Sequence, residues 1–313
     1  SQTQIGKDID GEAAGDHSGY VSISNDGTIV AIGAPGNNPT GKDAGYVRVF
    51  ENILDNWVQK GNTIHGEATG DKFGSSVSLS GDGSVIAIGG PYNDGNNTDA
   101  GHVRVFENVS GVWEQIGDDI YGVDVEDSFG RYVSLSDDGS KLAISGYFCC
   151  GIQHGFPNVG DTRIYENISG IWTQIGGVIN TGFRGISDVE LSADGSVVAI
   201  SSPGGGLFLW SNFYVSGVEV YKNISGVWTQ LGDAIVGESP DGFYYNFFGG
   251  VSLANNDSIT AIAIGGSLAT RVYKISTADE WGQLGVDIET GFFRPGISLS
   301  NNANILIIGG SIT

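Results

Sequence analysis

The chain has no methionine, two cysteines and few basic residues. Of its 313 residues, 14 are Lys or Arg and 36 are Asp or Glu, which gives a formal net charge of −22 at pH 7. A surface of this charge repels nucleic-acid phosphates, so the sequence argues against a nucleic-acid partner and is compatible with cations and basic proteins. No run approaches about 18 consecutive apolar residues, so no membrane-spanning helix is predicted. No signal-peptide pattern is present, and the lack of methionine agrees with Ser1 as a mature or trimmed terminus.

The two cysteines, Cys149 and Cys150, are adjacent in the sequence. This arrangement has neither C-x-x-C spacing nor the spacing of a metal motif. Two interpretations stay open: a strained disulfide between neighbouring residues, or two free thiols on a loop.

Motifs that mark catalytic sites are also missing. The sequence contains no H-E-x-x-H, G-x-S-x-G or P-loop pattern, and its four histidines do not share a repeat register. The sequence therefore assigns no catalytic residue, and an enzyme is the less favoured interpretation.

The sequence does contain a unit of about 56 residues that is repeated along the chain. Its tryptophans are spaced by 56, 59, 56 and 53 residues, at Trp57, Trp113, Trp172, Trp228 and Trp281. In residues 71–122, apolar residues alternate with small or polar ones at Val77 and Leu79, Val85 and Ala87, Val103 and Val105, and Trp113 and Ile116. Period-two alternation predicts half-buried strands, and turn residues separate four of them. Fixed-period units of four short strands predict an all-β fold, a β-propeller of six four-stranded blades in a single domain over residues 1–313.

The two ends of the repeat array differ from its middle. Residues 1–11 match the fourth strand of other units, so the strand from Gln4 to Ile9 is expected to close the propeller by completing the last blade. The last blade, from Pro295 to Thr313, lacks its third strand in this sequence. We expect residues beyond Thr313 or a strand from a neighbouring chain to fill the gap, and the second option predicts self-assembly through the incomplete blade.

Short motifs within the units resemble a known family. Phe73-Gly74 at the start of one strand and Gly33-Ala34-Pro35 at the end of another resemble FG-GAP repeats, the units of integrin α-subunit propellers. Similar tandem units occur in large secreted proteins of marine microorganisms. The resemblance implies a β-propeller and an extracellular or cell-surface location, but it does not define an activity.

One family feature is not carried over. Many FG-GAP blades hold Ca²⁺ in a D-x-D-x-D-G loop, because Ca²⁺ needs an oxygen-rich shell of ligands. Here the corresponding loop has shrunk to Ser80-Gly81-Asp82-Gly83, which predicts a hairpin turn.

Acidic pairs in another loop are the better candidate for Ca²⁺. Glu12 with Asp16, and Glu67 with Asp71, recur in the pattern G-E-x-x-G-D. These carboxylates could supply Ca²⁺ ligands together with backbone carbonyls. Alternatively, each Asp accepts backbone N–H groups and holds its turn.

Two further features bear on the surface. Five N-x-S/T sequons predict N-glycosylation in a secretory setting, although Asn also suits these turns: Asn96, Asn108, Asn167, Asn223 and Asn256. Two loops, 204–216 and 242–248, are rich in aromatic residues that are candidate ligand-binding groups: Phe208, Trp210, Phe213, Tyr214, Tyr244 and Tyr245. Clustered aromatics favour sugar stacking or a protein interface, unless the loops bury them.

Together these features favour an extracellular binding or structural propeller that acts in adhesion, a surface coat or filament assembly through loops on one face. The alternative is a carbohydrate-active module, either a lectin or a polysaccharide-cleaving enzyme, that uses the aromatic loops.

Overall fold

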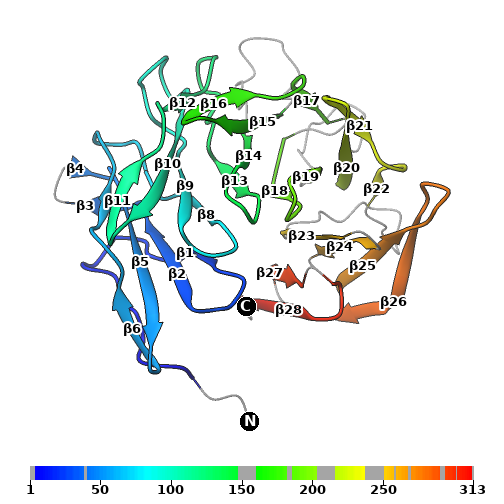
Figure 1. The fold of residues 1–313 in the computed structure, drawn as a ribbon, viewed down its shortest axis with the longest axis horizontal. Helices are drawn as coiled ribbons and strands as arrows, with labels where there is room; N and C mark the ends of the chain where they lie inside the picture. Colours follow the sequence, from blue (N-terminus) through cyan, green and yellow to red (C-terminus); the bar gives the residue numbers. More distant parts are fainter. Residues whose placement is uncertain are drawn as a thin grey trace, which may run out of the picture. The chain divides into compact units, whose positions relative to one another are not determined.

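The protein is described by a computed structural model that covers residues 4–38, 41–146, 160–181, 185–202, 216–236, 250–256, 259–266, 269–289, 293–300 and 302–311. Throughout these residues the regular structure is β-strand (Figure 1), and none of them forms a helix long and apolar enough to cross a membrane. The chain forms two compact units, Ser1–Gly146 with Tyr165–Gln174, and Tyr147–Ile164 with Ile175–Thr313. The expectation of a single domain stays a prediction.

The strands form sheets in chain order, each an antiparallel meander. The first sheet holds β1 (Tyr20–Ile23), β2 (Ile29–Ala34), β5 (Tyr46–Ile53), β6 (Asn56–Gln59) and β7 (Ile64–His65). The second holds β8 (Ser76–Leu79), β9 (Val85–Gly90), β10 (His102–Val109), β11 (Val112–Gln115) and β12 (Ile120–Tyr121). The third holds β13 (Tyr132–Leu135), β14 (Lys141–Ser145), β15 (Asp161–Ile168), β16 (Ile171–Gln174) and β17 (Ile179–Asn180).

The later sheets follow the same plan. The fourth holds β18 (Asp188–Leu191), β19 (Val197–Ser202), β20 (Gly217–Ile224), β21 (Val227–Gln230) and β22 (Ile235–Val236). The fifth holds β23 (Val251–Asn256), β24 (Ile259–Gly265), β25 (Ala269–Ile275) and β26 (Trp281–Glu289). Two-stranded sheets are formed by β27 (Phe293–Leu299) with β28 (Leu306–Ser311), and by β3 (Asn37–Asn38) with β4 (Gly41–Lys42). The pair of β27 and β28 supplies the first two strands of the last repeat, as expected from the sequence.

Both faces of a sheet are buried, each against a different neighbour. On β9, Ile86 and Ile88 pack with Ile29 and Val47 of the first sheet. The alternate residues of β9, such as Val85, belong to a second cluster with residues of the third sheet. Because successive side chains of a strand point to opposite faces, one apolar strand contributes to two cores. In the second sheet, each face is thus buried against a neighbouring sheet.

The Asp-Gly loops are hairpin turns, as predicted. In the second sheet, Oδ1 of Asp82 accepts hydrogen bonds from the Ser80 hydroxyl at 2.8 Å and the Ser84 backbone N–H at 2.9 Å. Burial acts to raise the pKa of Asp82, but these donors outweigh burial and the pKa lies below its usual range. The carboxylate therefore acts as the acceptor that closes the turn.

In five repeats, a tryptophan binds the stretch of chain that ends the preceding unit. The indole N–H donates to a backbone carbonyl, and the residue that carries this carbonyl directly follows a glutamine. The N···O distances are 3.1 Å for Trp57–Ile5, 2.8 Å for Trp113–Lys60, 3.0 Å for Trp172–Ile116, 3.1 Å for Trp228–Ile175 and 2.9 Å for Trp281–Leu231. In the inner strands, a serine hydroxyl makes a second link, as when Ser78 accepts from the Leu135 N–H at 2.9 Å.

The predicted fourth strand is present in the first four sheets, but it is interrupted and forms two short strands. In the second sheet the chain leaves β11, turns at Gly117 with φ of 73°, and returns as the short β12. Both pieces pair with β10. The interruption between them contains the Ile116 carbonyl, which accepts the indole N–H of Trp172. The break therefore supplies the acceptor that the next repeat needs.

The N-terminal segment differs from the prediction. Residues 4–11 were expected to contain a strand from Gln4 to Ile9, but the chain has no strand there. The Ile5 carbonyl instead accepts the indole N–H of Trp57, and the Asp10 carbonyl accepts from Arg48. The segment corresponds to the interrupted part of other repeats, which explains why it is not extended. Completion of the last blade by this segment, and a count of six blades, stay predictions.

We predict that Gly117→Ala destabilises the protein by about 2 kcal/mol. Gly117 has a φ of 73°, which strains an alanine backbone, and an added Cβ would lie 2.6 Å from the Gly170 carbonyl oxygen and 3.2 Å from the Trp172 ring. Chemical denaturation followed by tryptophan fluorescence measures the change. Gly177→Ala is the control, because a Cβ there meets nothing within 4 Å. Equal stability of the two variants would contradict the role given to the glycine–tryptophan contact.

Candidate functional site

The recurring acidic pairs have divided roles in the first two sheets. Asp16 is buried and accepts hydrogen bonds from the Ala13 N–H and the Tyr46 hydroxyl, both at 2.7 Å. Asp71 is buried too, and accepts from the Ala68 N–H at 3.3 Å and the Asn93 amide at 2.8 Å. Each Asp therefore holds its own loop.

The glutamates of these pairs lie beside arginines. Glu12 is 3.9 Å from Arg48, and Glu67 is 3.4 Å from Arg104. A third loop is also held by a buried Asp, and it was not predicted from the sequence. In this loop Asp127 accepts a hydrogen bond from the Val123 N–H at 3.1 Å. The signal that would have found it is an Asp two residues before Phe-Gly, shared by Asp71 and Asp127.

Calcium at the Glu67 and Asp71 loop stays a prediction, and it has a direct test. If Ca²⁺ binds there only in the folded state, adding CaCl₂ to metal-free protein raises the melting temperature by mass action. Asp71→Asn removes the charge while keeping one acceptor oxygen, and should abolish that rise. A melting temperature unchanged across millimolar calcium would leave these carboxylates as turn formers.

A second polar cluster lies in the second sheet and was not anticipated from the sequence. His102 begins β10, and its register places it opposite Tyr121 of β12 and Gly90 of β9. The imidazole is fully buried, and its Nδ1 lies 3.5 Å from Oδ2 of Asp119. Nε of Arg104 lies 3.4 Å from the other oxygen of Asp119. One ligand atom each from Glu67, His102 and Asp119 lies within 4.8 Å of the others.

Asp119 is ionised throughout the ordinary pH range. Burial acts to raise its pKa, but the neighbouring His102 imidazole, the Gln115 amide and the Arg104 guanidinium outweigh burial and lower the pKa to about 2. The Gln115 amide donates to Oδ1 at 2.7 Å, and the Tyr121 hydroxyl donates to Oδ2 at 3.1 Å. The cluster thus holds a permanent negative charge beside a buried imidazole.

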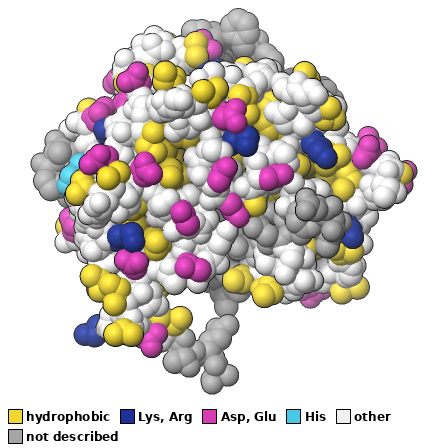
Figure 2. All heavy atoms as spheres, viewed as in Figure 1, with side chains coloured by type: hydrophobic (Ala, Val, Ile, Leu, Met, Phe, Trp, Pro, Cys, Tyr) yellow, Lys and Arg dark blue, Asp and Glu magenta, His cyan; other side chains and the backbone are white. Residues whose placement is uncertain are grey.

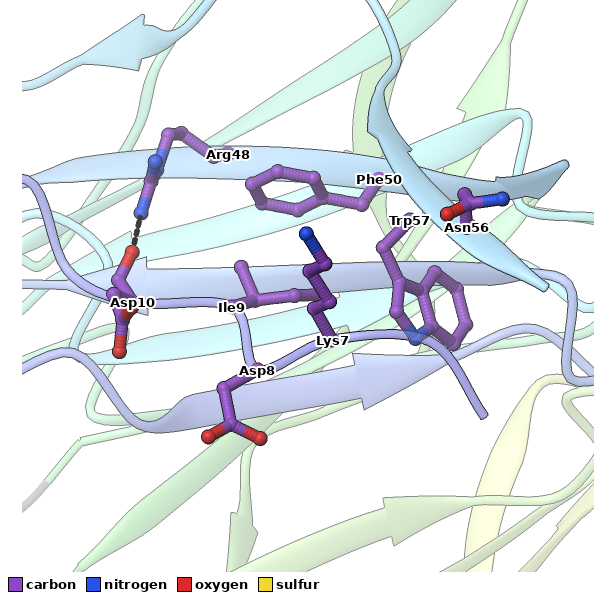
Figure 3. A pocket seen from close by; sticks show the side chains of 8 residues that line it. All are labelled: Lys7, Asp8, Ile9, Asp10, Arg48, Phe50, Asn56 and Trp57. Atoms are coloured by element: carbon purple, nitrogen blue, oxygen red, sulfur yellow. Dashed lines mark hydrogen bonds between the residues drawn. The ribbon is translucent and has the colours of Figure 1, made fainter. Parts of the chain in front are cut away.

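Grooves form where the interrupted strand of one repeat meets the tryptophan hairpin of the next. One groove of about 480 Å³ is lined by residues that include Asp118, Asp119, Tyr121 and Trp172. The corresponding groove in the first sheet, of about 250 Å³, is shown in Figure 3. There Arg48 and Phe50 of β5 face the stretch that contains Ile9 and Asp10, while the Asp8 carboxylate points away.

Acidic loops come together at one end of the first compact unit. Residues 93–99 join β9 to β10, and residues 122–128 join β12 to β13. The Glu126 N–H donates to the Thr98 carbonyl at 2.9 Å, and the Ser128 N–H donates to the Asp99 carbonyl at 3.0 Å. These bonds hold the two loops side by side. Burial, and then the charges of Asp94 and Glu126, raise the pKa of Asp99.

The remaining sequence candidates have mixed outcomes. The aromatic residues Phe208, Trp210, Phe213, Tyr214, Tyr244 and Tyr245, and the cysteines Cys149 and Cys150, lie outside the described residues. In three sequons the Asn side-chain oxygen accepts the N–H of the residue three positions later, at Asn108, Asn167 and Asn223. Asn96 donates its amide to the Gly122 carbonyl, and Asn256 ends β23. Turn geometry thus explains three of the asparagines, and glycosylation stays a prediction.

Comparisons with known proteins agree with this architecture. Hydrazine synthase of Kuenenia stuttgartiensis has a similar structure, with a TM-score of 0.62 at 14% identity, over 93% of this chain and 80% of that chain. The Dos1 propeller follows with a TM-score of 0.52 at 11% identity, over 93% of this chain and 64% of that chain. At such identities the likeness establishes the fold alone, and the chain is a β-propeller protein. No curated protein matches it.

The repeat itself is identified at one place in the chain. Residues 65–106 match the FG-GAP repeat family, which confirms the resemblance there. The structure shows what this motif does: Phe73 is fully buried, and a Cβ on Gly89 would lie 1.9 Å from the Gly130 carbonyl oxygen. Glycines at these positions allow the backbones of neighbouring repeats to approach closely.

Proposed function

We propose that this chain is an extracellular binding propeller that recognises a basic protein partner through the acidic loops 93–99 and 122–128, in adhesion, a surface coat or filament assembly. The observation that carries the proposal is the set of three carboxylates, Asp94, Asp99 and Glu126, held together by hydrogen bonds between the loops. In the described part of the chain, none of the three forms an ion pair.

Like charges held at close range destabilise one another until a positive group arrives. Here the Asp99 backbone N–H donates to the Asp94 carboxylate at 2.8 Å, so the loop backbone fixes the Asp94 carboxylate independently of any partner. A Lys or Arg side chain that reaches the three carboxylates relieves their repulsion without any rearrangement of the loops. The wider surface supports the proposal, because acidic side chains are spread across the face in Figure 2 and basic ones are isolated.

The proposed extracellular location is supported by other observations. FG-GAP repeats are typical of extracellular proteins, and five sequons are available to a secretory pathway. Both observations favour a protein that acts outside the cell or at its surface.

Binding of a fluorescent decalysine peptide at low ionic strength tests the site. We expect the triple variant Asp94→Asn, Asp99→Asn, Glu126→Gln to weaken binding about tenfold, because close charge pairs dominate the attraction, and we expect 0.5 M salt to abolish binding. The matched control is Asp55→Asn, Glu114→Gln, Asp279→Asn, which removes the same net charge from exposed positions elsewhere. If both triple variants weaken binding equally, the attraction comes from net charge and the loop site is wrong.

The alternative function, a carbohydrate-active module, is supported by the aromatic loops 204–216 and 242–248 of the sequence. Stacking of a sugar ring on an aromatic side chain predicts retention on a glycan array. Trp210→Ala should then reduce the signal, while Tyr20→Ala, at an exposed aromatic residue of β1 outside these loops, serves as the control. An array without any positive glycan would exclude the lectin interpretation.

A further inference from the structure

The buried imidazole of His102 lacks the hydrogen bonds that such a group normally has. Its side chain has no exposed surface, and neither ring nitrogen has a hydrogen-bond partner among the described residues. A neutral imidazole contains one donor and one acceptor, and leaving buried polar atoms unpaired costs about 1–3 kcal/mol. The cluster around His102 therefore calls for an additional partner.

The surroundings of the ring show which nitrogen is available. A Cβ on Gly90 would lie 2.8 Å from Nε2, so the backbone of β9 closes that side. The rings of Phe73 and Tyr121 pack at centroid distances of 5.8 and 6.1 Å. Nδ1 faces Asp119 instead, on the side where Glu67 and Arg104 lie.

The distance between Nδ1 and the Asp119 carboxylate suits a shared ion. At 3.5 Å, it exceeds the 2.7–3.2 Å or so of an N–H···O hydrogen bond. Two ligand atoms on one tetrahedral Zn²⁺, each bound at about 2.1 Å, are separated by about 3.4 Å. Glu67 completes the set, because its side chain is 48% exposed and is free to adjust to an ion at the mouth of the cluster.

We propose that His102, Asp119 and Glu67 form a binding site for a divalent transition-metal ion of the Zn²⁺ type. A nitrogen donor beside two carboxylates favours Zn²⁺ and its first-row neighbours over Ca²⁺ and Mg²⁺, which prefer oxygen ligands alone. Three protein ligands leave a coordination position for water or for a group from a partner molecule. The Tyr121 hydroxyl, which donates to the Asp119 ligand atom at 3.1 Å, orients that carboxylate.

Arg104 is the main opposing charge, and its contacts keep it beside the site. Its guanidinium donates to Gln115 at 3.0 and 2.7 Å and packs over the Phe73 and Phe106 rings. Its 3.4 Å distances to Glu67 and Asp119 exceed the 2.7–2.9 Å or so of a tight charge-assisted bond. With Arg104 counted, the two carboxylates leave one net negative charge, which attracts a cation.

The first sheet provides an internal comparison. Tyr46 occupies the register of His102, opposite Ala34, and donates its hydroxyl to Asp16 at 2.7 Å. Thr63 stands where the second sheet has Asp119, and it accepts from Gln59 at 3.2 Å, as Asp119 accepts from Gln115. The same scaffold therefore satisfies its polar groups without an ion when the imidazole is replaced.

Calorimetric titration of metal-free protein with ZnCl₂ tests the proposal, and CoCl₂ titration reports the ligand geometry through visible absorption. We expect one ion per chain and a rise in melting temperature with Zn²⁺. Asp119→Asn and Glu67→Gln should each weaken binding at least tenfold. His102→Tyr, which copies the first sheet, should abolish the cobalt bands.

Glu12→Gln is the matched control, because Glu12 lies beside Arg48 as Glu67 lies beside Arg104. It should bind Zn²⁺ like the unmodified protein. If Asp119→Asn proves unstable, the exposed Glu67→Gln variant still decides the question. Failure of the unmodified protein to bind Zn²⁺ at millimolar concentration, or equal binding by Glu67→Gln and Glu12→Gln, would overturn the proposal. Either result leaves the acidic-loop proposal untouched, since its carboxylates differ.

Discussion

The hydrogen bond from the indole of five tryptophans to a carbonyl of the preceding unit is the contact on which the described structure depends. One such bond contributes only about 1 kcal/mol, but it fixes where one repeat meets the next. It requires a break in the outer strand so that a carbonyl is available, and a glycine after that carbonyl so that the ring fits, as at Ile116, Gly117 and Trp172. The grooves and the His102 cluster lie beside these breaks.

Carboxylates serve two separate purposes in this acidic chain. Some are structural: Asp82 closes a hairpin, and Asp71 holds a loop. Others, such as Asp94 and Asp99, are placed together by backbone hydrogen bonds and have no positive neighbour in the described part of the chain. Charge counting alone cannot separate the two groups, because both arise from the same repeated loops.

Much of the fold could be predicted because the repeat places each apolar residue in a fixed register. The spacing of Trp57 and Trp113 and the Asp82-Gly83 turn gave correct strands and turns. The interruption after β11 was missed, since Gly117 reads as one more turn residue until its contact with Trp172 is known. His102 and Asp119 were missed for a related reason: they lie on different strands, and only the pairing of β10 with β12 brings them together.

The tryptophan contact also bears on how such a chain changes in evolution. Each of the tryptophans Trp113, Trp172, Trp228 and Trp281 takes a carbonyl from the repeat before its own, so the tryptophan contacts join neighbouring repeats. A duplicated copy placed between two existing repeats would find a carbonyl acceptor in the repeat before it and an indole N–H donor in the repeat after it. The tryptophan junction by itself is therefore compatible with the gain, loss or exchange of whole repeats by recombination.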